Sequence, residues 1–388
     1  MQVSNGTVDP VDRDLIGHQG SRAQIATPAL VLDLDAFHAN LETMAAFAQA
    51  SGIALRPHAK THRCAAIARA QRDAGAVGIC CAKLGEAEAL LAADPGLGSV
   101  LLTSPVVGER TIERLVALAQ TGAEVMLVVD HPRNVADLSM AARAADLNFD
   151  VLIDIDLGMM RTGIAEPTAV VVLAHEIAGM PGLRFAGLQA YAGHLQHLED
   201  PAGRRALLSA AFDKVRTIRS LLEQEGLSPR LITGGGTGTH VMDVAEGVLN
   251  ELQVGSYVFM DVEYDAVPLA EAGDPAPSYR ASLFVQARVI SANAGPLVTV
   301  DAGFKALATD GPKPVVISGA SEGAVYVFMG DEHGAIIGEG AGRPELGDLV
   351  TLQVPHCDPT VNLYDRFHVV RGDQLVDTWA VTARGRSR

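Results

Sequence analysis

The stretch "IALRPHAKTHRCAAIARAQRDAGAVGICC" (residues 53–81) contains the pattern that decides the fold. A short apolar run at residues 53–57 is followed by a polar loop and then by an amphipathic segment that ends at Gly75. A second β-branched run, residues 77–81, comes directly after that glycine, which is a typical signal for the end of a helix. This order predicts a strand, a helix and a second strand, the repeating unit of a parallel sheet.

The same unit recurs as far as about residue 258. Eight strands are predicted, at residues 53–57, 77–81, 99–103, 124–130, 149–156, 185–191, 230–234 and 252–259. Eight units favour an α/β fold with a closed (β/α)8 TIM barrel over an open doubly wound sheet. A ninth unit precedes them at residues 29–52, where we expect a strand, an aspartate cap and a long helix.

The helical period disappears beyond about residue 270. Alternating strands separated by Gly, Pro and Asp turns are predicted there, at residues 282–291, 296–303, 324–330, 348–356 and 375–383. We therefore expect three parts: an N-terminal segment (1–34) whose strand joins the β-domain, a barrel (35–265) and a C-terminal all-β domain (266–388). Residues 269–280 have the composition of the linker between the last two parts.

Composition excludes several classes of partner. The net charge of -16 argues against nucleic acid, whose phosphates it would repel. No run reaches the roughly 18 apolar residues of a membrane span. Residues 1–20 lack the basic and apolar blocks of a signal peptide, so we expect a cytoplasmic protein. The four cysteines show no C-x-x-C spacing and are expected to be reduced.

The chemically unusual residues lie after the predicted barrel strands, where barrel active sites are found. They are Lys60 with His58 and His62, then Asp154, Asp156 and Arg161, then Tyr191, His194 and His197, and the segments 233–240 and 255–261. The triple glycine at 234–236 lets the backbone approach an anion closely, and the loops after the last two strands commonly bind phosphate. By itself, this loop could equally be a flexible turn.

A lysine and a phosphate loop at one rim suggest pyridoxal phosphate, whose aldehyde forms a Schiff base with an amine. The alternative for Lys60 is a solvated side chain. Arg56 and His58 add positive charge nearby, which would lower the pKa of the Lys60 amine and leave it nucleophilic. Arg161 would steady the ring oxygen of the cofactor, unless it simply pairs with Asp154 or Asp156.

A second candidate site is "PHCDPTVNLYD" (355–365) in the β-domain. If this segment is extended, His356 and Asp358 face the same way while Cys357 points elsewhere. An imidazole and a carboxylate suit Mn2+, Mg2+, Co2+ or Zn2+. The alternative is a hydrogen-bonded turn at Asp358 and Pro359.

Ordered motifs over nearly the whole chain carry a resemblance to a known family. They are "TPALVLDLDAFHANL", "RPHAKTHRC", "GICCAKLGEAEAL", "IDLGMMRTGI", "GLQAYAGHLQH", "ITGGGTG", "ELQVGSYVFMD", "VDAGFKA", "DEHG", "PHCDPTVNLYD" and "ARGRSR". The chain resembles the D-threonine aldolases, metal-activated pyridoxal phosphate enzymes of the alanine racemase fold type, whose relatives include D-3-hydroxyaspartate aldolase and the D-serine dehydratases. This fold type usually forms homodimers, so a homodimer is implied.

The resemblance also implies roles for individual residues. Lys60 would carry the cofactor, and His356 and Asp358 would bind the metal, most often Mn2+. The implied cofactor site comprises Lys60, His58, Arg161, Tyr191, Thr233, Gly234, Gly235, Gly236, Thr237, Ser256 and Tyr257. His197 is the candidate base for the substrate hydroxyl.

The implied reaction is cleavage of a D-3-hydroxy amino acid, such as D-threonine, to glycine and an aldehyde. Dehydratase relatives tend to have cysteine where this chain has Asp358, which favours aldol cleavage. D-3-hydroxyaspartate aldolase and D-serine or D-3-hydroxyaspartate dehydratase activities remain alternatives, as does a noncatalytic cofactor carrier. Ala192 and His194 depart from the pattern of some aldolases and leave the substrate side chain open.

Overall fold

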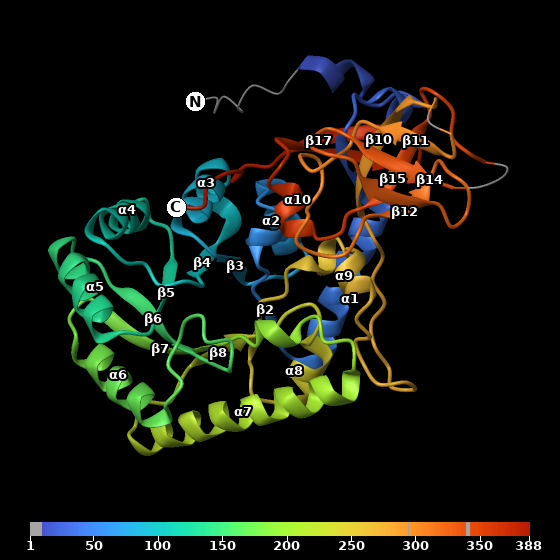
Figure 1. Cartoon of the computed structure of the whole chain (residues 1–388). Coiled ribbons are helices and arrows are strands. Elements are labelled where there is room, and N and C mark those ends of the chain that lie inside the picture. Colours follow the sequence, from blue (N-terminus) through green and yellow to red (C-terminus); the bar gives the residue numbers. More distant parts are fainter. Residues whose placement is uncertain (1–9, 294, 339–341) are drawn as a thin grey trace.

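The computed structural model describes residues 10–293, 295–338 and 342–388. These residues form a barrel and a β-domain that lies over one end of it (Figure 1). Residues 1–9, part of the segment for which no signal peptide is predicted, lie outside the described residues. None of the described helices is long and apolar enough to cross a membrane.

The eight predicted barrel strands are confirmed. They are parallel and follow the order β2-β9-β8-β7-β6-β5-β4-β3. Their bounds are β2 (Ala54–Leu55), β3 (Gly78–Cys81), β4 (Ser99–Leu102), β5 (Val125–Val129), β6 (Phe149–Ile155), β7 (Leu183–Ala190), β8 (Leu231–Gly234) and β9 (Glu251–Leu252). The Val77 N–H donates to the Leu55 carbonyl (2.8 Å) and the Cys80 N–H to the Pro57 carbonyl (2.8 Å), which nearly closes the barrel.

The last barrel strand is shorter than predicted. It ends at Leu252, and Ser256–Val258 form the 3-10 helix η6. The Tyr257 N–H donates to the Thr237 hydroxyl (3.0 Å), so it is not available to a neighbouring strand. The predicted run at 252–259 is therefore apolar because it is buried, although only its first residue belongs to the strand.

Helices surround the barrel and bury their apolar faces against its strands. Their bounds are α1 (Leu34–Ser51), α2 (Ala65–Asp73), α3 (Leu84–Ala93), α4 (Glu109–Gln120), α5 (Pro132–Ala144), α6 (Pro167–Gly179), α7 (Pro201–Gln224), α8 (His240–Glu246) and α9 (Val262–Asp265). The expected aspartate cap of the first helix is Asp33, whose carboxylate accepts a hydrogen bond from the Ala36 N–H (2.9 Å). Gly52, with φ of 64°, ends that helix.

The β-domain contains β1 (Ala29–Asp33), which pairs with β10 and β16. The other strands are β10 (Leu283–Ser291), β11 (Leu297–Val300), β12 (Val315–Ser318), β13 (Val325–Phe328), β14 (Gly334–Ile337), β15 (Leu349–Gln353), β16 (Arg366–Arg371) and β17 (Gln374–Ala380). Pairing of β10 with both β11 and β15 closes six of them into a small barrel. The predictions missed β12, β14 and β16. Strand β14 begins at Gly334, where a Cβ would lie 2.3 Å from the Tyr326 ring.

One buried carboxyl group supports the glycine-rich loop from below. The Asp243 side chain in α8 is almost completely buried and accepts a hydrogen bond from the Thr239 hydroxyl (2.7 Å). A Cβ on Gly235 would lie 2.4 Å from Asp243 Oδ2, and Gly235 has φ of 72°, so only glycine fits there. Burial raises the pKa of Asp243 to about 7.

This pKa predicts a pH-dependent contribution to stability. Because the pKa of Asp243 is raised on folding, its favourable contribution is complete below about pH 4 and is lost as the pH rises through about 7. Asp243→Asn keeps the shape of the group and stays neutral. The variant should therefore gain free energy of unfolding relative to wild type between about pH 4.5 and about pH 8, measured by urea unfolding.

The exposed carboxylate of Asp377 on β17 offers a matched control. Asp377→Asn measures what the same substitution does at an exposed position. If the difference between Asp243→Asn and wild type is the same at both pH values, the assignment of a raised pKa to Asp243 is wrong.

Candidate active site

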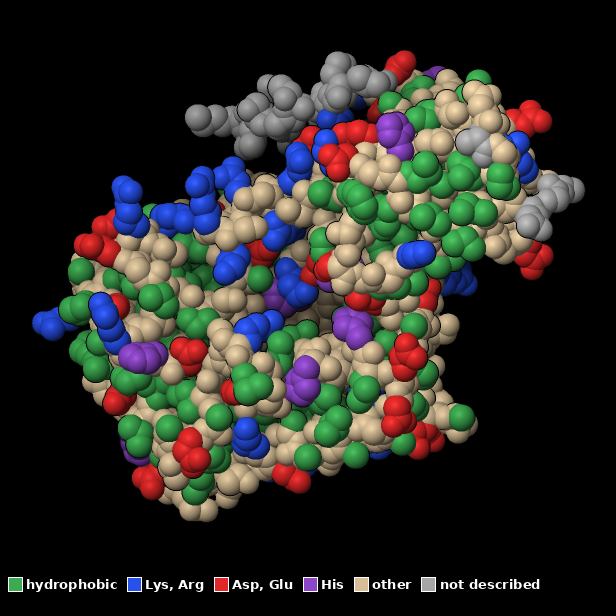
Figure 2. All heavy atoms as spheres, in the orientation of Figure 1, with side chains coloured by type: hydrophobic (Ala, Val, Ile, Leu, Met, Phe, Trp, Pro, Cys, Tyr) green, Lys and Arg blue, Asp and Glu red, His purple; other side chains and the backbone are tan. Residues whose placement is uncertain are grey.

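A cavity of about 510 Å³ opens at the C-terminal ends of the barrel strands. Its lining consists of His58, Lys60, Thr61, Ala82, Lys83, Thr103, Ser104, Pro105, Arg161, Thr162, Gln189, Tyr191, Gly236, Thr237, Gln253, Gly255, Ser256 and Tyr264. Figure 2 shows a hollow between the barrel and the β-domain, with basic and histidine side chains at its walls. A larger groove, of about 1030 Å³, lies between α4 and α5, but no lysine lines it. The smaller cavity is therefore the candidate active site.

His58 fixes the turn that carries Lys60. The turn is the 3-10 helix η3 (Ala59–Thr61), and the Lys60 N–H donates to His58 Nδ1 (3.4 Å). His58 Nε2 is therefore the protonated nitrogen and donates to the Thr103 hydroxyl (3.0 Å). Burial, together with the nearby Lys60 ammonium, lowers the pKa of His58 to about 3. His58 is thus a neutral ring that orients the turn.

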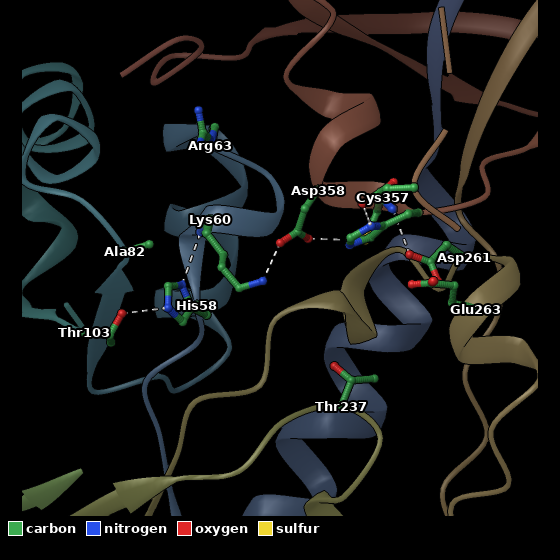
Figure 3. Close-up of polar contacts among 12 residues, drawn as sticks. His58, Lys60, Arg63, Ala82, Thr103, Thr237, Asp261, Glu263, Cys357 and Asp358 are labelled. Carbon is green, nitrogen blue, oxygen red and sulfur yellow. Dashed lines mark hydrogen bonds and ion pairs between the residues drawn. The ribbon is translucent and has the colours of Figure 1, made fainter. Parts of the chain in front are cut away.

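The Lys60 side chain reaches out of the barrel to the β-domain. Its Nζ donates to the carboxylate of Asp358 in an ion pair (Figure 3), with 40% of the lysine and 16% of the aspartate side chain exposed. Burial acts to lower the pKa of Lys60, but the Asp358 carboxylate overrides it and raises this pKa above its usual value. Burial likewise acts to raise the pKa of Asp358, and the Lys60 ammonium lowers it instead.

The prediction that neighbouring cations lower the pKa of Lys60 is therefore wrong. Arg56 Nε pairs with the Glu251 carboxylate (2.9 Å), and its guanidinium also donates to Ser99. Its charge is balanced inside the barrel, and His58 is neutral. His62 is also buried, with Nε2 3.2 Å from the Gln71 side-chain oxygen, and burial lowers its pKa to about 4.

Arg161 faces the cavity. Its guanidinium carbon lies 5.8 Å from the centre of the Tyr191 ring. Asp154 accepts hydrogen bonds from Thr162 (2.7 Å) and Gln189 (2.9 Å). Asp156 accepts from the Gly158 and Met160 N–H groups. Both aspartates thus have other donors, and Arg161 lies where it could contact a bound anion or phenolate.

Part of the glycine-rich loop faces the cavity, together with η6. Gly236, Thr237, Gly255 and Ser256 all line it. A Cβ on Gly236 would lie 2.4 Å from Gln196 Oε1, and one on Gly255 would lie 2.7 Å from the Thr61 hydroxyl. A side chain at either position would force these neighbours to shift, and backbone with no side chain forms this wall.

Four residues of the predicted cofactor site do not line the cavity. The Thr233 hydroxyl accepts a hydrogen bond from Gln253 (3.1 Å), and Gly235 packs on Asp243. Tyr257 is buried, and its hydroxyl accepts a hydrogen bond from Gln71 (3.2 Å). Gly234 is also packed away from the cavity, because a Cβ there would lie 1.9 Å from the Ala190 carbonyl oxygen.

The segment with His356 and Asp358 is not a strand, so the extended geometry predicted for it is wrong. Cys357–Val361 form helix α10, and His356 precedes its first turn. Asp261 accepts a hydrogen bond from the Cys357 N–H (2.8 Å), which helps to begin the helix. Pro359 in this first turn needs no N–H partner. The sequence pattern of alternating side chains therefore did not apply here.

The two proposed metal ligands face different partners in the structure. Asp358 contacts Lys60, whereas His356 Nδ1 lies 2.9 Å from a carboxylate oxygen of Asp310. Within residues 10–293, 295–338 and 342–388, no three His, Cys, Asp or Glu side chains converge as metal ligands do. The types of donor suit a divalent cation, but their arrangement does not yet form its site.

His197 lies beside an acidic group that the sequence predictions missed. His197 Nε2 is 3.9 Å from Glu263 Oε2, and its ring centre is 4.5 Å from that of Tyr264, which lines the cavity. Burial lowers the pKa of His197 and raises that of Glu263, and the carboxylates of Asp310 and Asp358 raise the pKa of Glu263 further. His197 itself lies outside the cavity lining.

Residues of the cavity and one residue beside His356 also went unpredicted. Gln189 lies at the C-terminal end of β7, and Gln253 lies just after β9. The Gln253 side-chain amide donates a hydrogen bond to the Gln189 side-chain oxygen (3.4 Å). A polar residue at the end of an apolar predicted strand was the signal that could have found both. Asp310 lies in a loop before β12, where no local pattern marks it.

Each of the two parts of the structure matches a known protein family. Residues 32–263 match a family model described as "Alanine racemase, N-terminal domain", and residues 282–370 match one described as "Putative serine dehydratase domain". A D-threonine aldolase from Arthrobacter sp is 40% identical, over 94% of each chain. A 3-hydroxy-D-aspartate aldolase from Paracoccus denitrificans (strain Pd 1222) is 38% identical, over 94% of this chain and 93% of that protein.

A solved structure shows the same similarity in three dimensions. The crystal structure of D-threonine aldolase from Filomicrobium marinum superposes with a TM-score of 0.89 at 41% identity, over 94% of this chain and 97% of that one. The chain is therefore a member of the D-threonine and 3-hydroxy-D-aspartate aldolase family, carbon–carbon lyases with an alanine racemase-like fold.

Proposed function

We propose that this chain is a pyridoxal phosphate- and divalent cation-dependent aldolase that cleaves D-3-hydroxy amino acids of the D-threonine type to glycine and an aldehyde. The contact between Lys60 and Asp358 carries the proposal. It brings a carboxylate from the β-domain into contact with an amine that lines the cavity at the barrel rim. An enzyme that both holds a carbonyl cofactor and acts on a substrate hydroxyl needs these two groups close together.

The cavity residues fit pyridoxal phosphate. When bound, this cofactor draws electrons from the α-carbon of an amino acid. Lys60 would hold it through its amine, and the glycine-containing wall of Gly236, Thr237 and Ser256 would bind the phosphate. Arg161 and Tyr191 lie on the same cavity and would orient the ring. His58 keeps the Lys60 turn in place through a neutral hydrogen bond.

His356 and Asp358 would hold the divalent cation, with Mn2+ as the first candidate. A cation there would make a substrate hydroxyl more acidic. His356 is already oriented by Asp310, which binds the Nδ1 side of its ring and leaves Nε2 for another contact. In the structure the Asp358 carboxylate is engaged with Lys60, and a cation would compete with the lysine ammonium for it.

His197 is our candidate for the base that accepts the proton of the substrate hydroxyl. Its lowered pKa keeps the ring neutral near pH 7, which is the form that accepts a proton. The ring packs against Tyr264, which lines the cavity, and its Nε2 lies 3.9 Å from the Glu263 carboxylate. Lys60 would remain the residue whose amine holds the cofactor.

The proposal includes a homodimer. Val315, Val325 and Ile337 are cross-strand neighbours on β12, β13 and β14, and each is at least 40% exposed. An outward-facing row of β-branched apolar residues is typical of a surface that a second subunit covers.

Lys60→Ala tests the cofactor attachment. Wild-type protein reconstituted with pyridoxal phosphate should be yellow, and the variant should lose this visible absorbance because it lacks the amine that would hold the cofactor. Lys83→Ala is the matched control, since Lys83 lines the same cavity and should leave the absorbance in place. A visible band that survives in Lys60→Ala, or a colourless wild type, contradicts the proposal.

Chelation and Asp358→Ala test the cation. Each should abolish release of glycine and aldehyde from D-threonine while leaving the visible absorbance intact, because the cofactor lies in the barrel. Activity should return to the chelated wild type with added Mn2+. Full turnover after exhaustive chelation excludes the cation, and release of ammonia with a 2-oxo acid in place of glycine identifies a dehydratase.

His197→Ala tests the base and should lower kcat by about 10²-fold. His194→Ala, at a second exposed histidine of the same loop, should change kcat by less than about threefold. If the two variants have the same kcat as wild type in a D-threonine cleavage assay, another group accepts the proton.

A further inference from the structure

The C-terminal tail, residues 381–388, leaves the β-domain and returns to the barrel, and Figure 1 shows the chain ending beside α3. Val381 and Ala383 are buried, and the Ala383 N–H donates to the Arg63 carbonyl (2.9 Å). At its end, the Arg388 carbonyl accepts hydrogen bonds from the Gly85 N–H (3.0 Å) and from Arg114 (3.1 Å). A Cβ on Gly85 would lie 2.4 Å from that oxygen, so glycine is required for this approach.

Arg63, three residues after Lys60, contacts α3, the segment after α10 and the tail, which meet at the junction between the barrel and the β-domain. Its guanidinium pairs with Glu86 of α3 (3.1 Å) and donates to the Asn362 side chain (2.7 Å). It also lies 3.4 Å from the Ser387 hydroxyl of the tail. Only 14% of the Arg63 side chain and none of the Glu86 side chain is exposed, which distinguishes this contact from an ordinary surface pair.

The conformation of Arg63 also indicates that its surroundings hold it in place. Its φ is 50°, in the left-handed region that residues other than glycine rarely adopt. Such a conformation costs free energy and persists only where several contacts impose it. The Arg63 N–H donates to the Ala59 carbonyl (2.7 Å), so the strained residue completes the turn that holds Lys60.

Two partners of Arg63, Asn362 and Glu86, connect it to segments of the candidate active site. Asn362 follows α10, the helix that carries Asp358, and it also accepts a hydrogen bond from the Gly385 N–H of the tail (3.1 Å). Glu86 accepts hydrogen bonds from the N–H groups of Ala82 (2.7 Å) and Lys83 (3.3 Å), both of which line the cavity. One guanidinium thus connects the Lys60 turn, the Asp358 helix and the cavity wall.

We propose that Arg63 is a positioning residue which, together with the C-terminal tail, sets the distance between Lys60 and Asp358 across the domain junction. This role rests on the proposed function only for its effect on catalysis. The physical part, that Arg63 and the tail restrain α10, is independent of the reaction. A small displacement of one group relative to the other is enough to slow a reaction that needs both.

The experiment compares Arg63→Met with Arg69→Met, since Arg69 lies on the adjacent helix α2 and pairs with Asp94 through a more exposed contact. Amide hydrogen exchange of residues 357–361 should become at least tenfold faster in Arg63→Met and stay unchanged in Arg69→Met. The visible absorbance of pyridoxal phosphate-loaded Arg63→Met should match wild type, while kcat for D-threonine falls about tenfold with KM nearly constant.

Removal of residues 385–388 provides a second variant that keeps the buried Arg63–Glu86 pair. This variant should also show faster amide exchange in α10 and a lower kcat. When it is combined with Arg63→Met, the fold-change in each quantity should be smaller than the product of the two separate fold-changes. Arg63→Lys, which retains the charge, should recover part of the loss. If amide exchange in α10 is unchanged in both Arg63→Met and the shortened protein, the proposed role of Arg63 is wrong. If wild type shows no visible absorbance with pyridoxal phosphate, only the proposed cofactor is wrong.

Discussion

The ion pair between Lys60 and Asp358 is the interaction on which this site depends. The barrel supplies the amine and the β-domain supplies the carboxylate, 298 residues apart in sequence. Neither domain has the complete constellation by itself. The packing of β1 into the β-domain sheet, followed directly by α1 on the barrel, ties the domains together at the N-terminal side. The tail does so at the other end of the chain.

Several other ionisable groups near this pair are already paired or neutral, so they compete little with the contact between Lys60 and Asp358. Arg56 is neutralised by Glu251, and His58 is held neutral by burial. Burial keeps the Asp243 carboxyl group, beneath the glycine-rich loop, protonated below about pH 7. This limits the negative charge where a phosphate would bind. The carboxylates of Glu263 in α9 and Asp310 in the β-domain lie near His356 and form an acidic region, as expected where a cation would bind.

The sequence predicted the barrel well because each βα unit is local. A buried parallel strand is an apolar run, and its helix follows with a 3.6-residue period and a glycine at its end. Lys60, Arg161, Tyr191 and Gly236 were found because they follow such runs, and all four line the cavity. The errors arose where long-range contacts decide the local structure. The helix at Cys357 depends on Asp261, nearly a hundred residues earlier, and the pKa of Lys60 depends on Asp358.

The central claim is that Lys60 and the cation site at Asp358 act on one bound molecule. Phosphorus NMR of the pyridoxal phosphate-loaded protein tests this directly, because Mn2+ broadens the signal of a phosphorus nucleus close to it. Our account predicts that Mn2+ broadens the cofactor phosphorus signal in wild type and leaves it sharp in Asp358→Ala. A signal that stays sharp in wild type at saturating Mn2+ would contradict it.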